Sequence, residues 1–343
     1  MASSLGALES ALAKSPAVRA FASALLSIVR AKDEPCSVLL TGPADPDGDS
    51  IGAGLGLGFA LQQLGVNVTV SGTPAFRYSW LPGASAMVPD GDVQGPFDVV
   101  VVLDGDRHRL HPTTAVEFAR AGHRVLLDHH RSTRPVGYDL SLIVPEAAST
   151  CELVIDVIDC WDVVVEERCA TALYTGIVFD TGGFRHANTR PATLRTAARL
   201  VEVGIDHSRI TNRVLFVRQP SGIRLLGQAL STVTISDGVA WAAISLADIA
   251  RCNGHYTDLE GVVDQLLLTY GVELACLIIE REPGRVKLSF RSNSDFDVSA
   301  LAQSLDSDGG GHRRAAGVEL WAPFDRVVAE VPPVLVDAIT SAG

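Results

Sequence analysis

The first segment of the chain that could do chemistry is a turn rich in proline and glycine. Asp45, Asp47 and Asp49 all lie within a five-residue stretch of this turn, 45–49. Carboxylates packed that closely repel one another unless a cation lies among them. The segment is therefore a candidate metal site. A solvated turn of the same composition would serve equally well, and this alternative stays open on these residues alone.

Two further acidic groups follow apolar runs. Asp104 and Asp106 end the run VVVVL, and Asp128, His129 and His130 end the run HRVLL. A carboxylate followed by two imidazoles offers ligands for a borderline transition metal, or one ligand and an acid. The alternatives are a helix N-cap in the first case and histidines capping a surface loop in the second.

Two later segments add an acid and a basic glycine run. Asp180 ends an apolar helical stretch. Taken alone, the glycines at 182–183 would indicate only the end of a helix. Residues 309–317, GGGHRRAAG, predict a glycine loop with bare backbone amides, combined with a basic trio that includes His312. Such amides can approach an anion closely, and the basic side chains add positive charge. A flexible hinge is the alternative for this segment.

The elements that must position these residues follow from the apolar pattern. In the first half, β-type runs alternate with helical stretches, which predicts a parallel sheet covered on both faces. Ligands collect beyond the carboxyl ends of such strands, where the polar clusters lie. The predicted strands are 36–42, 66–72, 97–106 and 123–130, and the first helix is 51–64.

The rest of the chain predicts more helix and then a second α/β region. Residues 146–177 are helical with a break at 161–165, and 189–204 are helical. The second region has strands in 233–249 and a strand pair in 273–293 joined by a Glu-Pro-Gly turn. We predict an α/β protein with a doubly wound, mostly parallel sheet and a second, smaller α/β domain. The expected boundaries are 1–204, a helical connector at 205–228, and 229–343.

Composition narrows the class of protein. The chain has 343 residues, which suggests two domains, and a net charge of −12. Such an acidic chain is poorly suited to duplex DNA, which needs a basic stripe. No apolar run is long enough for a membrane span, and the N-terminus predicts an amphipathic helix of the mature protein. The six cysteines form no CxxC pair, so we expect buried free thiols and a cytoplasmic protein.

Four alternating glycines, Gly52, Gly54, Gly56 and Gly58, occupy the first predicted helix. The G-x-G-x-x-G fingerprint of dinucleotide-binding folds fails, because its last position is Leu57 or Phe59. Each glycine costs about 1 kcal/mol relative to alanine inside a helix. We therefore expect this helix to approach the sheet or another helix closely.

Taken in order, six blocks of the sequence resemble the DHH phosphoesterase superfamily with its DHH-associated C-terminal domain. Within it, the chain is most similar to the nano-RNase/pAp phosphatases. The resemblance covers nearly the whole chain. The blocks are DPDGDSIG (45–52), VVVLDGD (100–106), LLDHH (126–130), GIVFDTGGFRHANT (176–189), LSFRSN (288–293) and GGGHRRAAG (309–317).

The resemblance implies a site for two Mn²⁺ ions, with Mg²⁺ as the alternative, between a DHH domain and a smaller substrate-binding domain. One ion would be held by Asp47, Asp104 and Asp180, and the other by Asp49, Asp104, His129 and Asp180. His130 matches the family histidine at the scissile phosphate, so His130, Asp104 and Asp180 form the expected catalytic group. The residues expected to bind phosphate and sugar are Arg185, Arg291, Gly310, Gly311, His312 and Arg314.

Two positions depart from the family pattern. Pro43 stands where the first motif normally has a metal-binding histidine, and a proline side chain cannot ligate a metal. Asp45 or a water molecule would have to take its place, which would favour harder cations and weaken binding. Asp308 replaces a glycine at the start of the glycine run and puts an acid beside the anion pocket.

The implied function is metal-dependent hydrolysis of RNA of two to a few nucleotides to mononucleotides, with pAp as a second substrate. A cyclic-dinucleotide phosphodiesterase would share the metals and differ in the pocket. An inorganic pyrophosphatase ranks low because its phosphate site lacks GGGH. Pro43 also leaves open a degenerate member that binds nucleotide without cleaving it. The oligomeric state stays open, with a homodimer as one candidate.

Overall fold

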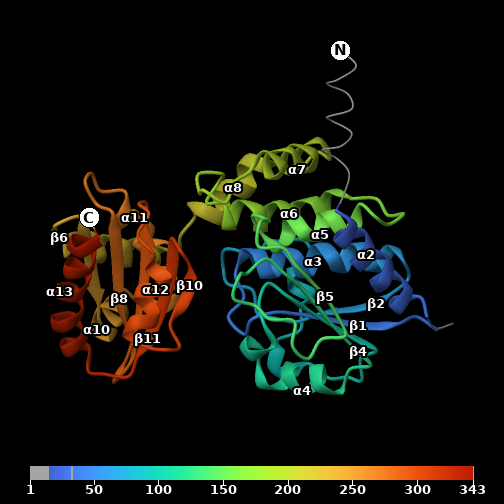
Figure 1. Ribbon diagram of the computed structural model, residues 1–343, viewed down its shortest axis with the longest axis horizontal. Coiled ribbons are helices and arrows are strands. Elements are labelled where there is room, and N and C mark those ends of the chain that lie inside the picture. The colour runs from blue at the N-terminus through green and yellow to red at the C-terminus, as the bar shows by residue number, and fades with distance from the viewer. Residues whose placement is uncertain (1–14, 32–33, 343) are drawn as a thin grey trace, which may run out of the picture. The chain divides into compact units, whose positions relative to one another are not determined.

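The computed structural model describes residues 15–31 and 34–342. The chain divides between Val217 and Arg218 into two compact units, drawn in blue to yellow-green and in yellow to red (Figure 1). The first part of the predicted N-terminal helix lies outside the described residues. The remainder forms α2 (Pro16–Val29), which Ser15 caps through a hydrogen bond from the Val18 amide.

The first unit is built on a five-stranded sheet in the order β2-β1-β3-β4-β5, with every pair parallel. The predicted doubly wound parallel sheet is therefore confirmed. The short fifth strand was not predicted, because it is only half-buried and lacks a continuous apolar run. The strands are β1 (Ser37–Thr41), β2 (Asn67–Val70), β3 (Val99–Leu103), β4 (His123–Asp128) and β5 (Leu140–Ile143).

Helices cover both faces of this sheet. Alternate residues of β3 contribute to two apolar clusters, Val99 and Val101 to the larger and Val100 and Val102 to the smaller. The larger cluster contains α2, α3 (Gly48–Gln63), α5 (Thr150–Ile158) and α6 (Glu167–Asp180). The smaller contains α4 (Pro112–Arg120). Helices α7 (Pro191–Glu202) and α8 (His207–Leu215) pack on α6. The predicted break at 161–165 separates α5 from α6.

The glycines of α3 allow the close approaches that the sequence predicted. A Cβ atom on Gly52 would lie 2.5 Å from the Ala172 carbonyl oxygen of α6, and one on Gly56 would lie 2.4 Å from Leu173 Cδ2. On the other side, Cβ atoms on Gly54 and Gly58 would lie 3.1 and 3.3 Å from the methyl groups of Val70. The helix is therefore sandwiched between α6 and the sheet.

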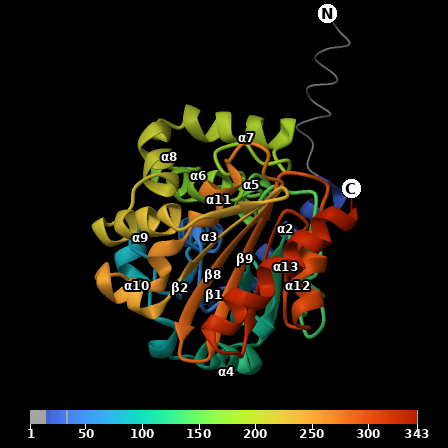
Figure 2. The same cartoon turned by 90° about the vertical axis from the view of Figure 1, so that its left-hand side faces the viewer.

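The second unit has a six-stranded mixed sheet in the order β10-β11-β9-β8-β7-β6, in which only β7 and β8 are parallel. One face packs on α12 and α13 and the other on α9, α10 and α11 (Figure 2). The predicted second α/β domain is thus present. Its strands are β6 (Thr234–Ser236), β7 (Val239–Ile244), β8 (Leu274–Glu282), β9 (Arg285–Ser292), β10 (Gly310–His312) and β11 (Ala315–Leu320). Its helices are α9 (Pro220–Ser231), α10 (Leu246–Arg251), α11 (Val262–Leu267), α12 (Val298–Leu305) and α13 (Phe324–Ala342).

Some local expectations need correction. The glycine run was expected to form a loop, but Gly310–His312 pairs with β11 as an edge strand, because its main-chain groups join the ladder. All six cysteines are free, yet Cys160 is exposed and Cys252 only half-buried, so the prediction of buried thiols holds for four of them. Single 3-10 turns occur at Ala84–Ala86, Asp90–Asp92, Arg107–Arg109 and Tyr256–Leu259. Within the described residues, no helix combines the length and the apolar character needed to cross a bilayer.

Candidate metal centre

The acidic clusters of the first unit meet at the carboxyl ends of β1, β3 and β4. The strand order reverses direction at β1, and this switch point is where open α/β sheets bind ligands. The loop after β1 leads to Asp47 and Asp49, β3 leads to Asp104, and β4 leads to His129. The ligand atoms of Asp49, Asp104 and His129 all lie within 4.8 Å of one another.

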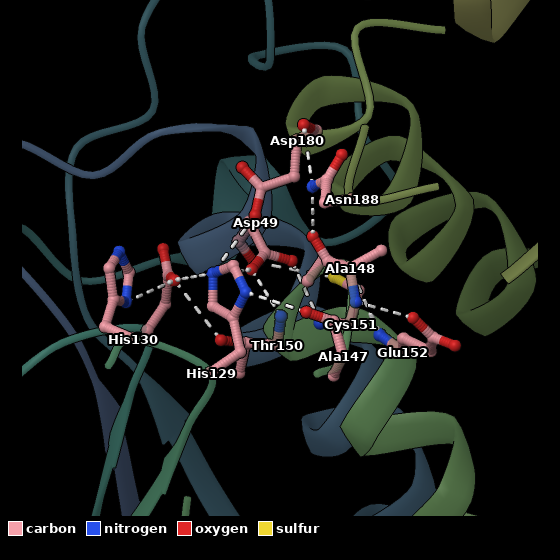
Figure 3. Close-up of polar contacts among 12 residues, drawn as sticks. Asp49, His129, His130, Ala147, Ala148, Thr150, Cys151, Glu152, Asp180 and Asn188 are labelled. Carbon is pink, nitrogen blue, oxygen red and sulfur yellow. Dashed lines mark hydrogen bonds and ion pairs between the residues drawn. The ribbon is translucent and has the colours of Figure 1, made fainter. Parts of the chain in front are cut away.

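His129 lies at the centre of this group (Figure 3). Its Nε2 atom is 3.2 Å from Asp180 Oδ2, 3.6 Å from Asp104 Oδ1 and 4.0 Å from Asp49 Oδ2. Four of the predicted metal ligands are therefore brought together from α3, α6 and the ends of two strands. His129 Nδ1 is 3.2 Å from the Ala147 carbonyl oxygen, which favours a proton on Nδ1 and presents Nε2 to the carboxylates.

Asp49 is fully buried and is held by the N-terminus of α5. Its Oδ2 atom accepts a hydrogen bond from the Thr150 amide at 2.6 Å, and Oδ1 accepts one from the Cys151 amide at 2.9 Å. The first amides of a helix lack partners within the helix and carry partial positive charge. They therefore orient this carboxylate as well as partly neutralising it.

Asp104 is held by two hydroxyl groups. Ser50 Oγ donates to Oδ2 at 2.7 Å, and Thr150 Oγ1 donates to Oδ1 at 3.2 Å. The residue has φ 59°, a left-handed conformation that side chains other than glycine rarely adopt. Such strain persists only where the surroundings enforce it, and it is frequent at functional sites.

His130 is oriented by the buried Asp128. The His130 Nδ1 atom lies 2.7 Å from Asp128 Oδ1, and the same oxygen accepts the amides of His129 at 2.8 Å and His130 at 3.2 Å. Burial acts to raise the pKa of Asp128, but the hydrogen bond with His130 and the charge of that imidazole outweigh it and hold the pKa below its usual value. Asp128 therefore orients the His130 imidazole and holds the main chain at His129 and His130.

The electrostatics of the site favour a cation. Burial and the neighbouring carboxylates raise the pKa of Asp49 to about 6 and that of Asp104 to about 7. Burial also raises the pKa of Asp180. Burial opposes a charge on His129, but the surrounding carboxylates outweigh it and raise its pKa well above the usual value. A divalent cation would relieve this repulsion, so the donor set of oxygens and one imidazole fits a metal such as Mn²⁺ or Mg²⁺.

The first motif contributes unevenly. Asp47 Oδ1 caps α3 by accepting the amides of Asp49 and Ser50, at 3.0 and 3.1 Å. Asp45 is exposed. Among the residues that the structure describes, it belongs to no cluster whose three ligand atoms lie within 4.8 Å of one another. Pro43 is buried and lines a small cavity of about 10 Å³ with Pro46 and Ser50.

Three of the predicted phosphate-binding residues of the second unit, Arg291, His312 and Gly310, share one sheet face, whereas Gly311 pairs with Ala316 at the position between. Arg291 of β9 pairs with Ala315 of β11, which pairs with His312 of β10. Cross-strand partners point to the same side of a sheet, so Arg291 and His312 flank a common strip. Gly310 and Gly317 pair two residues away and leave the backbone of that strip bare.

The two other predicted arginines lie at the surface. Arg314 is exposed, with its NH2 atom 3.8 Å from Asp295 Oδ1. Arg185 is exposed on the loop after α6 in the first unit. Arg291 itself is half-buried, and its Nε donates to Asp264 Oδ1 at 3.2 Å.

The turn at 147–152 contacts Asp49, Asp104 and His129, and it was not predicted to belong to the site. A signal was present: Ser149 and Glu152 have the S-x-x-E spacing of a capping box in front of an apolar helix. That spacing predicts where a helix begins, and nothing in it indicates that the helix start serves a metal site.

The comparisons with known proteins agree with this architecture. The DHH family, N-terminal domain, matches residues 37–177, and the DHHA1 domain matches residues 243–331. The chain is 34% identical to the bifunctional oligoribonuclease and PAP phosphatase NrnA of Thermus thermophilus over 87% of this chain and 89% of that one. It is 25% identical to NrnA of Bacillus subtilis over 86% and 93%, respectively.

Two further proteins are similar over most of this chain. The cyclic-di-AMP phosphodiesterase GdpP of Geobacillus thermodenitrificans is 27% identical over 94% of this chain but only 49% of its own length. The crystal structure of an exopolyphosphatase-related protein from Bacteroides fragilis matches with a TM-score of 0.82 and 24% identity, over 94% and 96% of the two chains. The chain therefore belongs to the DHH family, with an N-terminal DHH domain followed by a DHHA1 domain.

Proposed function

We propose that this chain is a cytoplasmic, metal-dependent phosphodiesterase that degrades very short RNA to mononucleotides and also removes phosphate from pAp. The observation that carries the proposal is the convergence of Asp49, Asp104, His129 and Asp180 in a chain 34% identical to a bifunctional oligoribonuclease and PAP phosphatase. The net charge of −12 favours a short ligand seated in a local pocket over a long duplex.

In the first unit, Asp49, Asp104, His129 and Asp180 would hold divalent cations, with Mn²⁺ as the first candidate and Mg²⁺ as the alternative. Such ions supply a water of lowered pKa and stabilise charge on phosphoryl oxygens. The α5 amides and the hydroxyls of Ser50 and Thr150 keep the carboxylates in place before substrate arrives.

His130 would act on the substrate itself. Asp128 fixes its Nδ1 atom, so the opposite nitrogen can orient the scissile phosphate or pass a proton to the leaving oxygen. In the second unit, Arg291 and His312 would bind the terminal phosphate of the nucleotide, beside the bare backbone of Gly310 and Gly311. An arginine suits this role because its planar fork engages phosphate through two hydrogen bonds.

The test is hydrolysis of pApA by the full chain with Mn²⁺, with products separated by chromatography. We expect AMP from pApA, and AMP with inorganic phosphate from pAp. A wild-type chain that turns over neither substrate with Mn²⁺ or Mg²⁺ would overturn the proposal. Retained nucleotide binding in that case would favour the degenerate member that Pro43 suggests.

A second candidate is cleavage of a cyclic dinucleotide. The similarity to the cyclic-di-AMP phosphodiesterase GdpP, which extends over 94% of this chain, favours it. The same assay with cyclic di-AMP separates the two. Faster turnover of cyclic di-AMP than of pApA would assign the chain to the cyclic substrate.

A further inference from the structure

A buried glutamate stands behind the turn that contacts the candidate metal ligands. Glu152 is 3% exposed and belongs to neither the predicted nor the observed ligand group. It lies in the first turn of α5, directly after Thr150 and Cys151, whose amides hold Asp49. Figure 3 shows its carboxylate on the side of the turn away from His129.

The carboxylate of Glu152 closes the turn on itself. Its Oε2 atom accepts a hydrogen bond from the Ala148 amide at 2.7 Å, while Ser149 Oγ accepts one from the Glu152 amide at 3.1 Å. In a usual capping box the glutamate returns to the amide of the capping residue, here Ser149. Glu152 reaches one residue further back and thereby fixes the peptides that precede the helix.

Contacts with α7 complete the environment of Glu152. Thr193 Oγ1 donates to Oε2 at 3.1 Å, and Arg190 NH2 lies 3.6 Å from Oε1. A buried carboxylate is costly unless it is paired and hydrogen-bonded, and these two side chains supply the pairing. The turn is thus held from a helix that contributes no ligand of its own.

The peptides that Glu152 fixes are the ones that reach the site. The Ala147 carbonyl oxygen contacts His129 Nδ1, and the Ala148 carbonyl oxygen accepts from Asn188 Nδ2 at 3.0 Å. The same Asn188 nitrogen donates to the Asp180 carbonyl oxygen at 3.2 Å. A shift of this turn would therefore disturb contacts to several ligand residues at once.

We propose that Glu152 is a positioning residue, which holds the turn at 147–151 so that Asp49, Asp104 and His129 face one cation. This inference rests on the metal-dependent function proposed above. Glu152 touches neither metal nor substrate in this scheme, and it acts through the Ala148 amide. The side-chain oxygen that accepts from the Ala148 amide matters more for this role than the negative charge of the carboxylate.

The experiment measures Mn²⁺ affinity of the full chain by electron paramagnetic resonance titration, without substrate. We expect Glu152→Ala to weaken Mn²⁺ binding about 10- to 100-fold, the usual cost of losing an outer partner of a metal ligand. Glu152→Gln should lose less than about 10-fold, because its amide oxygen still accepts from the Ala148 amide. Loss of affinity with partial rescue by glutamine would support the positioning role.

A matched control separates positioning from mere stability. Asp159 pairs with Arg199 at 2.8 Å and ties the other end of α5 to the same helix α7. We expect Asp159→Ala to lower the melting temperature in EDTA and leave Mn²⁺ affinity unchanged. If Glu152→Ala behaved in the same way, with normal Mn²⁺ binding, the positioning role would be overturned.

Two further outcomes keep the test decisive. If Glu152→Ala does not fold, Glu152→Asp withdraws the acceptor by one methylene group, and wild-type Mn²⁺ affinity in that variant would equally overturn the proposal. A wild-type chain that binds no Mn²⁺ and hydrolyses neither pApA nor pAp with Mn²⁺ or Mg²⁺ would overturn both this inference and the proposed function. Equal Mn²⁺ binding by wild type and Glu152→Ala would overturn this inference alone.

Discussion

The carboxylate group of the first unit and the arginine–glycine strip of the second differ in how they hold charge. Asp49 is 0% and Asp104 is 3% exposed, whereas the side chain of Arg291 is 31% exposed and His312 is exposed. Buried like charges repel each other and invite a cation of fixed position. Exposed basic groups beside bare backbone leave room for an anion of variable shape. Substitutions among the buried carboxylates should therefore reduce activity more than substitutions in the exposed arginine–glycine strip.

The largest effect should come from a ligand of the buried group. We expect Asp104→Asn to lower turnover of pApA with Mn²⁺ by at least about 100-fold, because the carboxylate charge toward the cation is lost. Initial rates measured by chromatography check this. Asp106→Asn is the control, since the Asp106 contact is to Tyr138 at 3.4 Å and not to the group. Normal turnover in Asp104→Asn would remove Asp104 from the site.

One helix glycine from each unit tests whether the first unit is packed more tightly than the second. A Cβ atom on Gly176 of α6 would lie 2.3 Å from Cys151 Sγ and 2.6 Å from Asp49 Oδ1, whereas one on Gly227 of α9 meets nothing within 4 Å. We expect Gly176→Ala to destabilise by about 1–3 kcal/mol and to weaken Mn²⁺ binding. Gly227→Ala should stabilise by about 0.5–1 kcal/mol. Melting curves of both variants check the signs, and a stable Gly176→Ala would contradict the tight packing.

In the second unit, we expect Arg291→Lys to weaken binding of a 5′-phosphorylated dinucleotide about 10-fold and to leave Mn²⁺ affinity unchanged. Lysine keeps the charge but cannot form the paired hydrogen bonds of a guanidinium. Calorimetric titration of each ligand separates the two effects. Arg313→Lys is the control, because the Arg313 guanidinium donates to the Asp295 carbonyl oxygen at 2.6 Å. If Arg291→Lys weakened Mn²⁺ binding instead, the assignment of metal binding to the first unit and phosphate binding to the second would be wrong.

The buried carboxylates also predict an unusual pH dependence for the metal-free chain. The pKa of Asp49 is raised from 3.8 to about 6 and that of Asp104 to about 7. Between about pH 4 and pH 7 the folded state therefore holds more protons than the unfolded state, so the free energy of unfolding falls as pH rises. The raised pKa of His129 acts in the same direction.

We expect the melting temperature in EDTA to fall by roughly 2–8 °C between about pH 5 and pH 8. Mn²⁺ should flatten this slope, because bound cations favour the ionised carboxylates. Asp104→Asn removes one of the groups and should flatten it in EDTA as well. An unchanged slope in that variant would assign the pH dependence to other groups.

The smallest effect concerns the first motif. Asp45 is exposed and lies outside the observed ligand group, so we expect Asp45→Ala to change Mn²⁺ affinity less than about twofold, as for an ordinary surface substitution. Titration of Mn²⁺ against both proteins is the measurement. A clear loss of affinity would instead show that Asp45 replaces the histidine absent at Pro43.

The sequence predicted the residues that converge at the candidate site better than it predicted the residues that support them. Asp104 and His129 were predictable because apolar strands end at them, and strand ends meet at one edge of a parallel sheet. The turn at 147–152 was not, because its contacts to His129 and Asp49 come from the main-chain groups of Ala147 and Cys151, which every residue type carries. The edge strand Gly310–His312 was expected as a loop, since glycine runs rarely indicate a ladder.

The glycine contacts between α3 and α6 have a consequence for redesign. Asp49 lies in the first turn of one of these helices and Asp180 ends the other, and no side chain separates their backbones at Gly52 or Gly176. The spacing between the two carboxylates is therefore a property of the backbone. A redesign for a larger or smaller ion would therefore have to change these glycines as well as the ligand side chains, because the glycines set how closely the two helix backbones approach.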